Sequence, residues 1–141
     1  MHSCAAGKNP ASDEVDTPGI RCLLRVHIML AELKQREKEG RLINVGLIGC
    51  GAMGLGIAYQ VGRTPGMRLS FVADFNEEAA KRAAEVYGKP TKILKDGMAA
   101  LKDGKIPCDV FVEATNSIIA AYDYCAAAIE RKAHCVLMNA E

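Results

Sequence analysis

The sequence lacks an excess of charge of either sign. Its 141 residues include 18 lysines and arginines against 17 aspartates and glutamates, which gives a formal net charge of +1 at pH 7. The balance is also local, because residues 1–40 contain six basic and six acidic side chains. No basic stripe is available to neutralise a phosphate backbone, so we expect no nucleic acid as a partner.

Metal-ligand spacing is also missing. Six cysteines are present, but no Cys-x-x-Cys pair occurs, and among the histidines only His134 adjoins a cysteine. We therefore expect no metal site. A disulfide framework is not expected either, because a chain of this length can fold on its apolar core. The thiols are predicted to be reduced and mostly buried, in a cytoplasmic protein.

Neither a signal peptide nor a membrane span is predicted. Residues 1–17 have no continuous apolar stretch of the kind that a signal peptide needs, and we predict that they are disordered. Residues 42–62 form an uncharged run of 21 residues, long enough to cross a bilayer, but six of them are glycines. A strand, a turn and a helix explain this run better.

Strand and helix patterns alternate along the rest of the chain. Thr17 and Pro18 predict the start of a helix that ends at Gly40. Short apolar runs predict strands at residues 42–48, 67–73, 91–94, 109–114 and 134–139. Helical patterns predict helices at residues 52–63, 77–86, 96–101 and 118–132.

This alternation predicts an α/β fold. We expect a Rossmann-type doubly wound parallel sheet, truncated after about five strands, with a preceding N-terminal helix. The predicted organisation is a disordered segment over residues 1–17, the helix over residues 18–40, and a C-terminally incomplete domain over residues 41–141. Right-handed crossovers place the carboxyl ends of all the strands at one edge of the sheet, where ligands bind.

Two helices have apolar positions that predict how they pack. We expect the N-terminal helix to pack on the domain or on a second subunit through an apolar face. That face consists of Ile20, Leu23, Leu24, Leu30 and Leu33. We expect the final helix to pack through the apolar positions of its own helical repeat. Those positions are Ile118, Tyr122, Cys125 and Ile129.

A glycine motif follows the first predicted strand. Gly49, Gly51 and Gly54 have the spacing G-x-G-x-x-G, and a helical pattern follows. In order, these glycines are expected to permit a tight turn, the approach of a pyrophosphate, and close packing of the helix on the strand. The alternative is a glycine-rich turn that binds nothing. The predicted cofactor-binding residues of this loop are Gly49, Cys50, Gly51, Ala52, Met53 and Gly54.

Asp74 ends the second predicted strand, twenty residues after Gly54. An acid at this point accepts hydrogen bonds from the ribose hydroxyls of a dinucleotide. It also repels a 2′-phosphate, and neither Phe75 nor Asn76 supplies a compensating charge, while Lys81 lies about two helical turns further on. We therefore predict NAD as the cofactor, with NADP less favoured. The alternative role of Asp74 is to cap the next helix.

Two further loops are predicted to lie at the same edge of the sheet. Thr115 and Asn116 follow the fourth predicted strand and are candidate contacts to the nicotinamide ribose. The alternative is that Asn116 and Ser117 merely cap the next helix. Asn139 and Glu141 follow the last strand and either face the nicotinamide or a substrate, or are frayed and solvated.

The cysteine of the glycine loop has two interpretations. Cys50 lies at the start of a predicted helix, an environment that lowers the pKa of a thiol and favours its oxidation. Alternatively, the residue between the first two glycines is simply small. No lysine or histidine of the chain is placed to act as a general acid or base at a nicotinamide, so no catalytic residue is predicted.

The motifs together resemble those of homoserine dehydrogenase-like NAD(P)-dependent oxidoreductases, several of which carry a C-terminal SAF domain. The resemblance covers the chain from residue 18 onward and rests on residues 36–41, 43–54, 112–115 and 136–141. It implies a Rossmann domain over residues 41–141 that binds a nicotinamide dinucleotide. The cofactor residues that it implies are Gly49, Gly51, Gly54, Asp74, Thr115 and Asn116.

The resemblance also implies a reaction, the transfer of hydride between the cofactor and a small carbonyl or alcohol substrate. In such enzymes the last strand leads into a catalytic and dimerisation region, which would lie beyond Glu141. We therefore expect part of a longer oxidoreductase, inactive alone, that self-associates through the exposed edge of its last strand. The alternative is a non-catalytic module that binds or senses NAD(H). A methyltransferase fits the motif spacing less well.

Overall fold

The computed structural model describes residues 18–138 of the chain. The predicted disordered segment 1–17 lies outside the described residues, and so do residues 139–141, which include Asn139 and Glu141. The chain divides into two units, residues 1–32 and 33–141. The domain boundaries expected from the sequence stay predictions.

The N-terminal helix α1 (Pro18–Lys38) is present as predicted. It ends at Lys38, and Gly40, two residues later, has a φ of +69°, a left-handed conformation that glycine adopts easily. Leu23 and Leu30, from its predicted apolar face, are exposed. Two other positions of that face have side chains outside the described part of the chain, Ile20 and Leu24. What this helix packs against stays a prediction.

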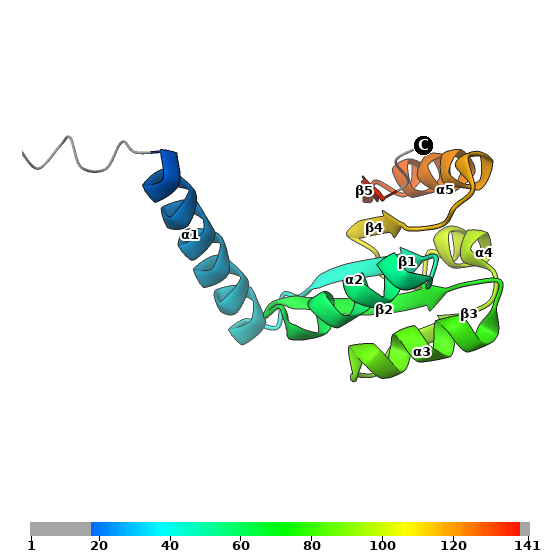
Figure 1. The fold of residues 1–141 in the computed structure, drawn as a ribbon, viewed down its shortest axis with the longest axis horizontal. Coiled ribbons are helices and arrows are strands. Elements are labelled where there is room, and N and C mark those ends of the chain that lie inside the picture. Colours follow the sequence, from blue (N-terminus) through cyan, green and yellow to red (C-terminus); the bar gives the residue numbers. More distant parts are fainter. Residues whose placement is uncertain (1–17, 139–141) are drawn as a thin grey trace, which may run out of the picture. The chain divides into compact units, whose positions relative to one another are not determined.

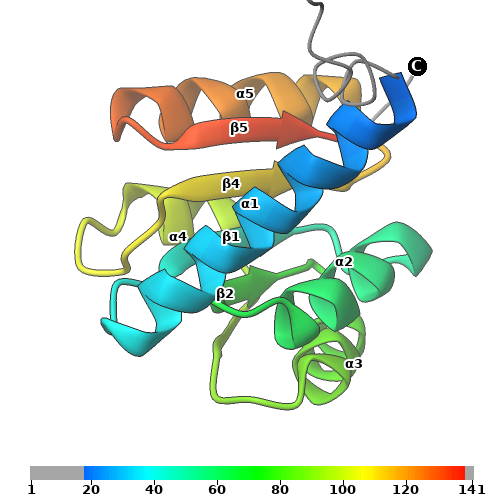
Figure 2. The same ribbon diagram turned by 90° about the vertical axis from the view of Figure 1, so that its left-hand side faces the viewer.

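Five parallel strands form one sheet in the order β3-β2-β1-β4-β5 (Figure 1). This confirms the predicted Rossmann-type α/β fold. Figure 2 shows β5 beside β4 at one side of the sheet. The strands are β1 (Ile43–Ile48), β2 (Met67–Ala73), β3 (Lys92–Leu94), β4 (Val110–Glu113) and β5 (His134–Leu137).

Four helices cover the two faces of the sheet. They are α2 (Ala52–Arg63), α3 (Glu77–Tyr87), α4 (Gly97–Lys102) and α5 (Ile118–Glu130). Residues of α2 and α3 pack on one face, and residues of α4 and α5 on the other. Side chains cap three of these helices, because the residue before each accepts a hydrogen bond from a first-turn N–H. The capping residues are Asn76, Asp96 and Ser117.

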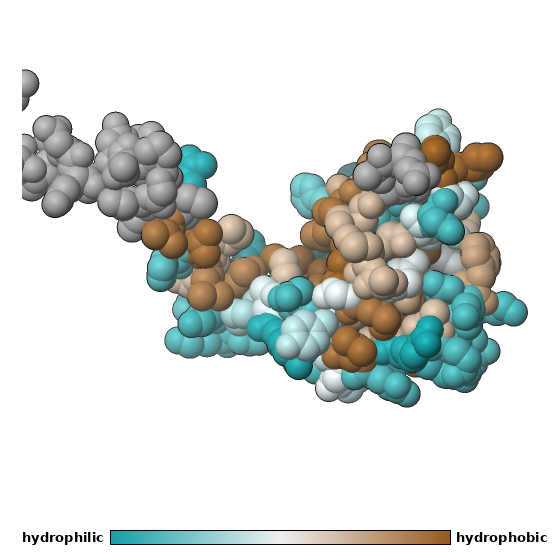
Figure 3. Space-filling view, viewed as in Figure 1, coloured by the Kyte–Doolittle hydropathy of each residue, from teal (hydrophilic) through white to brown (hydrophobic). Residues whose placement is uncertain are grey.

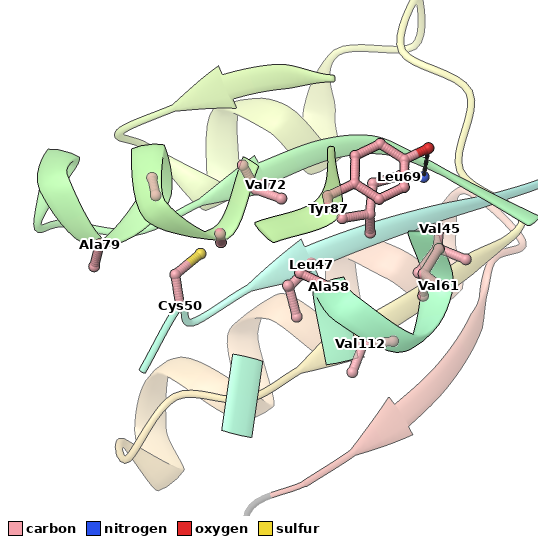
Figure 4. Packing of buried hydrophobic residues seen from close by; sticks show 12 residues of the cluster. Val45, Leu47, Cys50, Ala58, Val61, Leu69, Val72, Ala79, Tyr87 and Val112 are labelled. Atoms are coloured by element: carbon pink, nitrogen blue, oxygen red, sulfur yellow. Dashed lines mark hydrogen bonds between the residues drawn. The ribbon is translucent and has the colours of Figure 1, made fainter. Parts of the chain in front are cut away.

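The core under α2 and α3 includes Leu47 and Val72, which are fully buried (Figure 4). Tyr87 belongs to the same cluster, and its hydroxyl accepts a hydrogen bond of 3.1 Å from the backbone N–H of Leu69. This contact gives the polar end of a buried aromatic ring a partner.

The core under α4 and α5 is built around two aromatic rings. Phe111 of β4 and Tyr124 of α5 meet edge to face, with ring centroids 6.4 Å apart. Such a contact contributes about 1 kcal/mol beyond the area that it buries. It ties α5 to the strand that leads into it.

The apolar face predicted for α5 is wrong at three of its four positions, while Cys125 does pack against the core. Ile118, Tyr122 and Ile129 are exposed, at 59%, 76% and 65% of their full accessible surface. The helix instead buries Tyr124 and three small residues, Ala121, Ala127 and Ala128. Alanines let α5 lie close to the sheet, which leaves the larger side chains on the outside. Figure 3 shows hydrophobic residues on the surface over this helix.

The strand register aligns the residues that follow β1, β2 and β4. Ile48 is the partner of Ala73 on one side and of Glu113 on the other. The backbone N–H of Gly49 donates to Ala73 over 2.9 Å, and that of Ala114 donates to Ile48 over 2.8 Å. After β1, the chain adds β2 and β3 on one side of that strand, and it then crosses over to add β4 and β5 on the other side. The carboxyl end of β1 is therefore the switch point at which ligands bind in such folds.

Candidate functional site

The loop between β1 and α2 has a backbone path that requires glycine at two positions. Gly49 has a φ of +93°, and a Cβ there would lie 2.4 Å from the carbonyl carbon of Ala114. A Cβ on Gly54 would lie 2.0 Å from the carbonyl oxygen of Gly49. The first glycine therefore permits the turn, as predicted, and the third lets α2 pack closely on that turn.

Gly51 directly precedes α2 and leaves the first turn of that helix accessible. As the N-cap residue it supplies no side-chain hydrogen bond, and a Cβ built on it meets no atom within 4 Å. The first N–H groups of a helix have no partner within the helix, and they carry the positive end of its dipole. Ala52 and Met53, which follow, are exposed. This helix start is thus an accessible anion-binding geometry.

Asp74 lies at the same edge of the sheet, directly beside the glycine loop. Its Oδ2 accepts a hydrogen bond of 2.7 Å from the backbone N–H of Cys50. Its Oδ1 accepts one of 2.8 Å from the backbone N–H of Asn76. Each carboxylate oxygen has a second lone pair, so Asp74 can still accept from the hydroxyls of a ligand. The helix cap is Asn76 rather than Asp74.

Of the two interpretations of Cys50, the structure agrees with a buried residue of the core. The residue is fully buried, and its Sγ lies 3.6 Å from the carbonyl oxygen of Ala73. Figure 4 shows Cys50 within the core cluster. Burial, with a smaller contribution from the charge of Asp74, raises the pKa of this thiol to about 12. The side chain belongs to the core, so the start of the helix does not activate the thiol by lowering its pKa.

Glu113, which the sequence reasoning missed, shapes the loop after β4. It is completely buried, and its Oε1 accepts from the backbone N–H of Thr115 at 2.7 Å and from the Thr115 hydroxyl. Within the described residues, its Oε2 has no partner. The Thr115 hydroxyl therefore donates its proton to Glu113, so it can only accept a hydrogen bond from a ligand. The signal in the sequence that could have identified Glu113 is an acidic residue at the end of a predicted buried strand.

The two residues that follow Thr115 have different roles. Ser117 caps α5, because its Oγ accepts from the backbone N–H of Ala120 at 3.3 Å. Asn116 is exposed, and no hydrogen bond of its side chain is found within residues 18–138. The capping role weighed for both residues thus belongs to Ser117, and the Asn116 amide is free to contact a ligand.

A cavity of about 320 Å³ joins these elements. Gly49 and Gly51 line it from the glycine loop, Asp74 from the end of β2, and Thr115 and Asn116 from the loop after β4. The other predicted site residues, Cys50, Ala52, Met53 and Gly54, belong to the same loop and do not line it. Seven lining residues were not predicted as contacts, among them Phe75 and Lys95.

The arrangement combines three binding elements that a dinucleotide needs. The start of α2 attracts an anion, Asp74 accepts hydrogen bonds from a diol, and the cavity offers apolar walls for a flat ring. Within residues 18–138 no cluster of histidine, cysteine, aspartate or glutamate is arranged to hold a metal ion. No helix in that range is both long and apolar enough to span a bilayer.

Comparison with known proteins gives a family and several related folds. The family described as homoserine dehydrogenase, NAD binding domain, matches residues 49–141. No curated protein matches the chain. A solved myo-inositol dehydrogenase from Lactobacillus casei, in complex with NAD(H) and myo-inositol, is 22% identical, with a TM-score of 0.60. The alignment covers 68% of this chain and 28% of that one.

Two other solved structures have the same fold. A myo-inositol dehydrogenase from Corynebacterium glutamicum is 21% identical, with a TM-score of 0.59, over 68% of this chain and 27% of that one. A 3-ketoreductase from Actinomadura kijaniata, a complex with TDP-benzene and NADP, is 21% identical. Its TM-score is 0.57, over 68% of this chain and 29% of that one. The chain thus spans less than a third of these structures.

The matched region and the fold lead to one conclusion. The family match includes 93 of the 141 residues, and it starts at the first glycine of the β1–α2 loop. The resemblance inferred from the motifs is therefore confirmed, and so is NAD as the cofactor of the family. The chain belongs to the family of homoserine dehydrogenase NAD-binding domains, the cofactor domains of NAD-dependent oxidoreductases.

Proposed function

We propose that the chain binds NAD(H) in the cavity at the carboxyl edge of the sheet. The pyrophosphate lies against the N–H groups at the start of α2, and Asp74 accepts hydrogen bonds from the hydroxyls of the adenosine ribose. The observation that carries this proposal is the 2.7 Å hydrogen bond from the Cys50 N–H to Asp74. It holds the ribose acceptor at a fixed place beside the phosphate site, as a single ligand would require.

The loop after β4 provides the next contacts. Thr115 and Asn116 line the cavity on the side away from Asp74's own loop, and we assign them to the nicotinamide half of the cofactor. Because the Thr115 hydroxyl donates to Glu113, it receives a hydrogen bond from a ribose hydroxyl rather than giving one. The amide of Asn116 can do either.

The longer oxidoreductase moves hydride between the nicotinamide and a small carbonyl or alcohol substrate. The cofactor supplies or takes the hydride, and a general acid or base must give or take the accompanying proton. No residue of this chain is assigned that proton transfer. We assign the proton transfer and the substrate contacts to polypeptide outside residues 1–141. We also propose that either this polypeptide or a second subunit covers the exposed edge of β5.

Titration with NADH tests the binding proposal. NADH fluorescence should change saturably with the wild-type chain. Asp74→Ala should weaken binding by about tenfold or more, because it removes the ribose acceptor and loosens the loop. Asp74→Asn keeps one acceptor for the Cys50 N–H and should bind NADH with intermediate affinity.

Asp123→Asn is the matched control, since Asp123 is exposed on α5 and does not line the cavity. It should leave NADH affinity unchanged. Equal NADH affinity for the wild type and Asp74→Ala would refute the site, and saturable binding of S-adenosylmethionine in place of NADH would refute the cofactor.

A further inference from the structure

A second cavity lies at the opposite edge of the sheet from the candidate cofactor site. It has a volume of about 370 Å³ and lies where β2 and β3 begin, beside the connection from α4 to β4. Asp74 follows the other end of β2, six residues after Arg68, so the two sites are about 20 Å apart along the strand. The residues that line the second cavity are Arg68, Leu69, Ser70, Pro90, Thr91, Lys92, Ile106 and Pro107.

The charges at the second cavity are both positive. Arg68 and Lys92 line it, and none of its described lining residues is acidic. Within residues 18–138, no ion pair of 4 Å or less involves either side chain. Lys81 on α3, by contrast, is paired with Glu77 at 2.9 Å. Two cations that share a cavity without a carboxylate repel each other, which favours the binding of an anion there.

Arg68 is held in place by the neighbouring strand. Its Nε donates a hydrogen bond of 2.6 Å to Oδ1 of Asn44, its register partner on β1. The side-chain amide of Asn44 in turn donates to Asp109 over 2.7 Å. In the described part of the chain, the two terminal nitrogens of the guanidinium have no partner. They keep four N–H donors in a planar fork, which matches two oxygens of an oxyanion.

The second cavity is also lined by a threonine whose hydroxyl lacks a partner. Thr91 is partly exposed, but its Oγ1 is inaccessible to solvent and makes no hydrogen bond within the described residues. An unpartnered buried hydroxyl costs free energy. Rotation about χ1 moves this hydroxyl to another staggered position, from which it can donate to a ligand in the cavity. The Ser70 hydroxyl already donates to the carbonyl of Val45 over 3.1 Å.

The other walls of the second cavity are apolar and fixed. Ile106 is 3% exposed, and its carbonyl oxygen accepts a hydrogen bond from the guanidinium of Arg131. Arg131 also donates to the carbonyl of Leu101 over 2.9 Å, which ties the start of this connection to the same side chain. Pro90 and Pro107 restrict the backbone on either side. Because the cavity volume is within the usual range for small-molecule sites, about 300–1,000 Å³, it has room for more than an ion.

We propose that the second cavity binds the phosphate group of a small soluble ligand through Arg68, Lys92 and Thr91. A phosphate carries between one and two negative charges at neutral pH and has three acceptor oxygens, which two cations and a hydroxyl can pair. A carboxylate has one charge and two oxygens, so it uses this set of donors less fully. The apolar walls contact the group that is attached to the phosphate. This site does not depend on the proposed function, because none of its residues lines the cofactor cavity.

Titration of the full chain with inorganic phosphate and with phenyl phosphate, followed through backbone amide resonances, tests the site. Each should shift residues 68–70 and 90–92 saturably, with a Kd of about 1 mM or lower. Tighter binding of phenyl phosphate supports a phosphate ester as the ligand, because its ring contacts the apolar walls. Equal affinities support the phosphate contact and assign the site to free phosphate. Benzoate, which has the same ring and one charge, should bind about fivefold more weakly.

Three variants locate the contacts. Lys92→Gln and Arg68→Gln should each raise the Kd for phenyl phosphate about threefold, because both side chains are exposed and each carries half of the charge. Thr91→Val should also weaken binding, yet it should not lower the urea midpoint without ligand, because it removes an unpartnered hydroxyl. Arg82→Gln is the matched control. It removes one positive charge from an exposed position of α3 outside the cavity and should leave the Kd unchanged.

Four outcomes would overturn the proposal. One is the absence of shifts at residues 68–70 and 90–92 at about 10 mM phenyl phosphate, which fills most of a site with a Kd near 1 mM. Another is a set of shifts confined to residues 49–54, which places the phosphate at the start of α2 instead. Equal weakening by Lys92→Gln and Arg82→Gln would show an effect of net charge rather than a site. Equal binding of benzoate and phenyl phosphate would exclude phosphate as the recognised group. The NADH titration tests the proposed function separately from all four.

Discussion

The backbone N–H of Cys50 donates a 2.7 Å hydrogen bond to Oδ2 of Asp74, 24 residues further along the chain. This bond links the glycine loop after β1 to the loop after β2. Asp74 therefore has two roles in the proposed site: it accepts hydrogen bonds from a ribose, and it anchors the turn that binds the phosphates. For the same reason, substitutions in the glycine loop should also affect ribose binding at Asp74.

Gly54→Ala should destabilise the fold by about 1–3 kcal/mol, because the added methyl group meets the Gly49 carbonyl oxygen at 2.0 Å. Gly56→Ala, two residues later in α2, is the control. A Cβ there meets nothing within 4 Å, so this variant should gain about 0.5–1 kcal/mol. Urea unfolding measures both. Two variants of equal stability would show that α2 does not pack against the turn as described.

Cys50 should be unreactive in the folded protein. Its pKa of about 12 leaves almost no thiolate at pH 8–9, so alkylation should be slow until the chain is unfolded in guanidinium. Peptide mass spectrometry after timed labelling measures the rate at this cysteine. Labelling at the same rate in folded and unfolded protein would contradict the buried position.

The same pKa predicts a loss of stability at high pH. An unfolded Cys50 ionises near the ordinary value of 9.0, while the folded thiol keeps its proton to about pH 12. Between those values the unfolded state binds fewer protons, so the free energy of unfolding falls as the pH rises. Cys50→Ala should lack this component, which a series of urea titrations from pH 8 to 11 can isolate. An identical pH dependence in the wild type and Cys50→Ala would argue against it.

Glu113 should be needed as an acceptor rather than as a charge. Glu113→Gln keeps a carbonyl oxygen for the N–H and hydroxyl of Thr115, and should cost about 1 kcal/mol. Glu113→Ala removes that acceptor and leaves a hole, so about 2–4 kcal/mol should be lost. Hydrogen exchange at the Thr115 amide should be fast only in the alanine variant. Equal exchange in the two variants would show that another group orders this loop.

Local patterns were sufficient to predict the elements and much of the site. The apolar run of β2 is predicted at residues 67–73, where the structure has it. Asp74 was placed beside the glycine loop because parallel strands end at one edge. Each of these features depends on residues close in sequence, or on the geometry that all parallel sheets share.

The features that the sequence did not predict depend on contacts between distant elements. The inner face of α5 consists of alanines and Tyr124, because α5 lies close to the sheet, and periodicity alone favoured its larger residues. The choice between the two interpretations of Cys50 depends on the direction in which its side chain leaves the loop, and the structure buries it. The place of Lys95 in the cavity depends on the loop after β3, the shortest strand.

The outer face of α5 offers a test of that correction. Tyr122, from the predicted face, is 76% exposed, so Tyr122→Lys should change the free energy of unfolding by less than about 0.5 kcal/mol. Ala128 is fully buried, and Ala128→Leu should cost about 1–3 kcal/mol through overpacking. Thermal unfolding of both variants decides between the two faces. A larger loss for Tyr122→Lys would restore the face expected from the periodicity.

The most direct test of the account is a map of backbone amide resonances during titration with NADH. We predict that the largest shifts occur at residues 49–54, because the first N–H groups of α2 receive the pyrophosphate, with further shifts at residues 74–76 and 115–117. The shifts should saturate together, as one ligand would produce. Shifts confined to other parts of the sheet, or none at saturating NADH, would contradict the claim that this loop and Asp74 form the cofactor site.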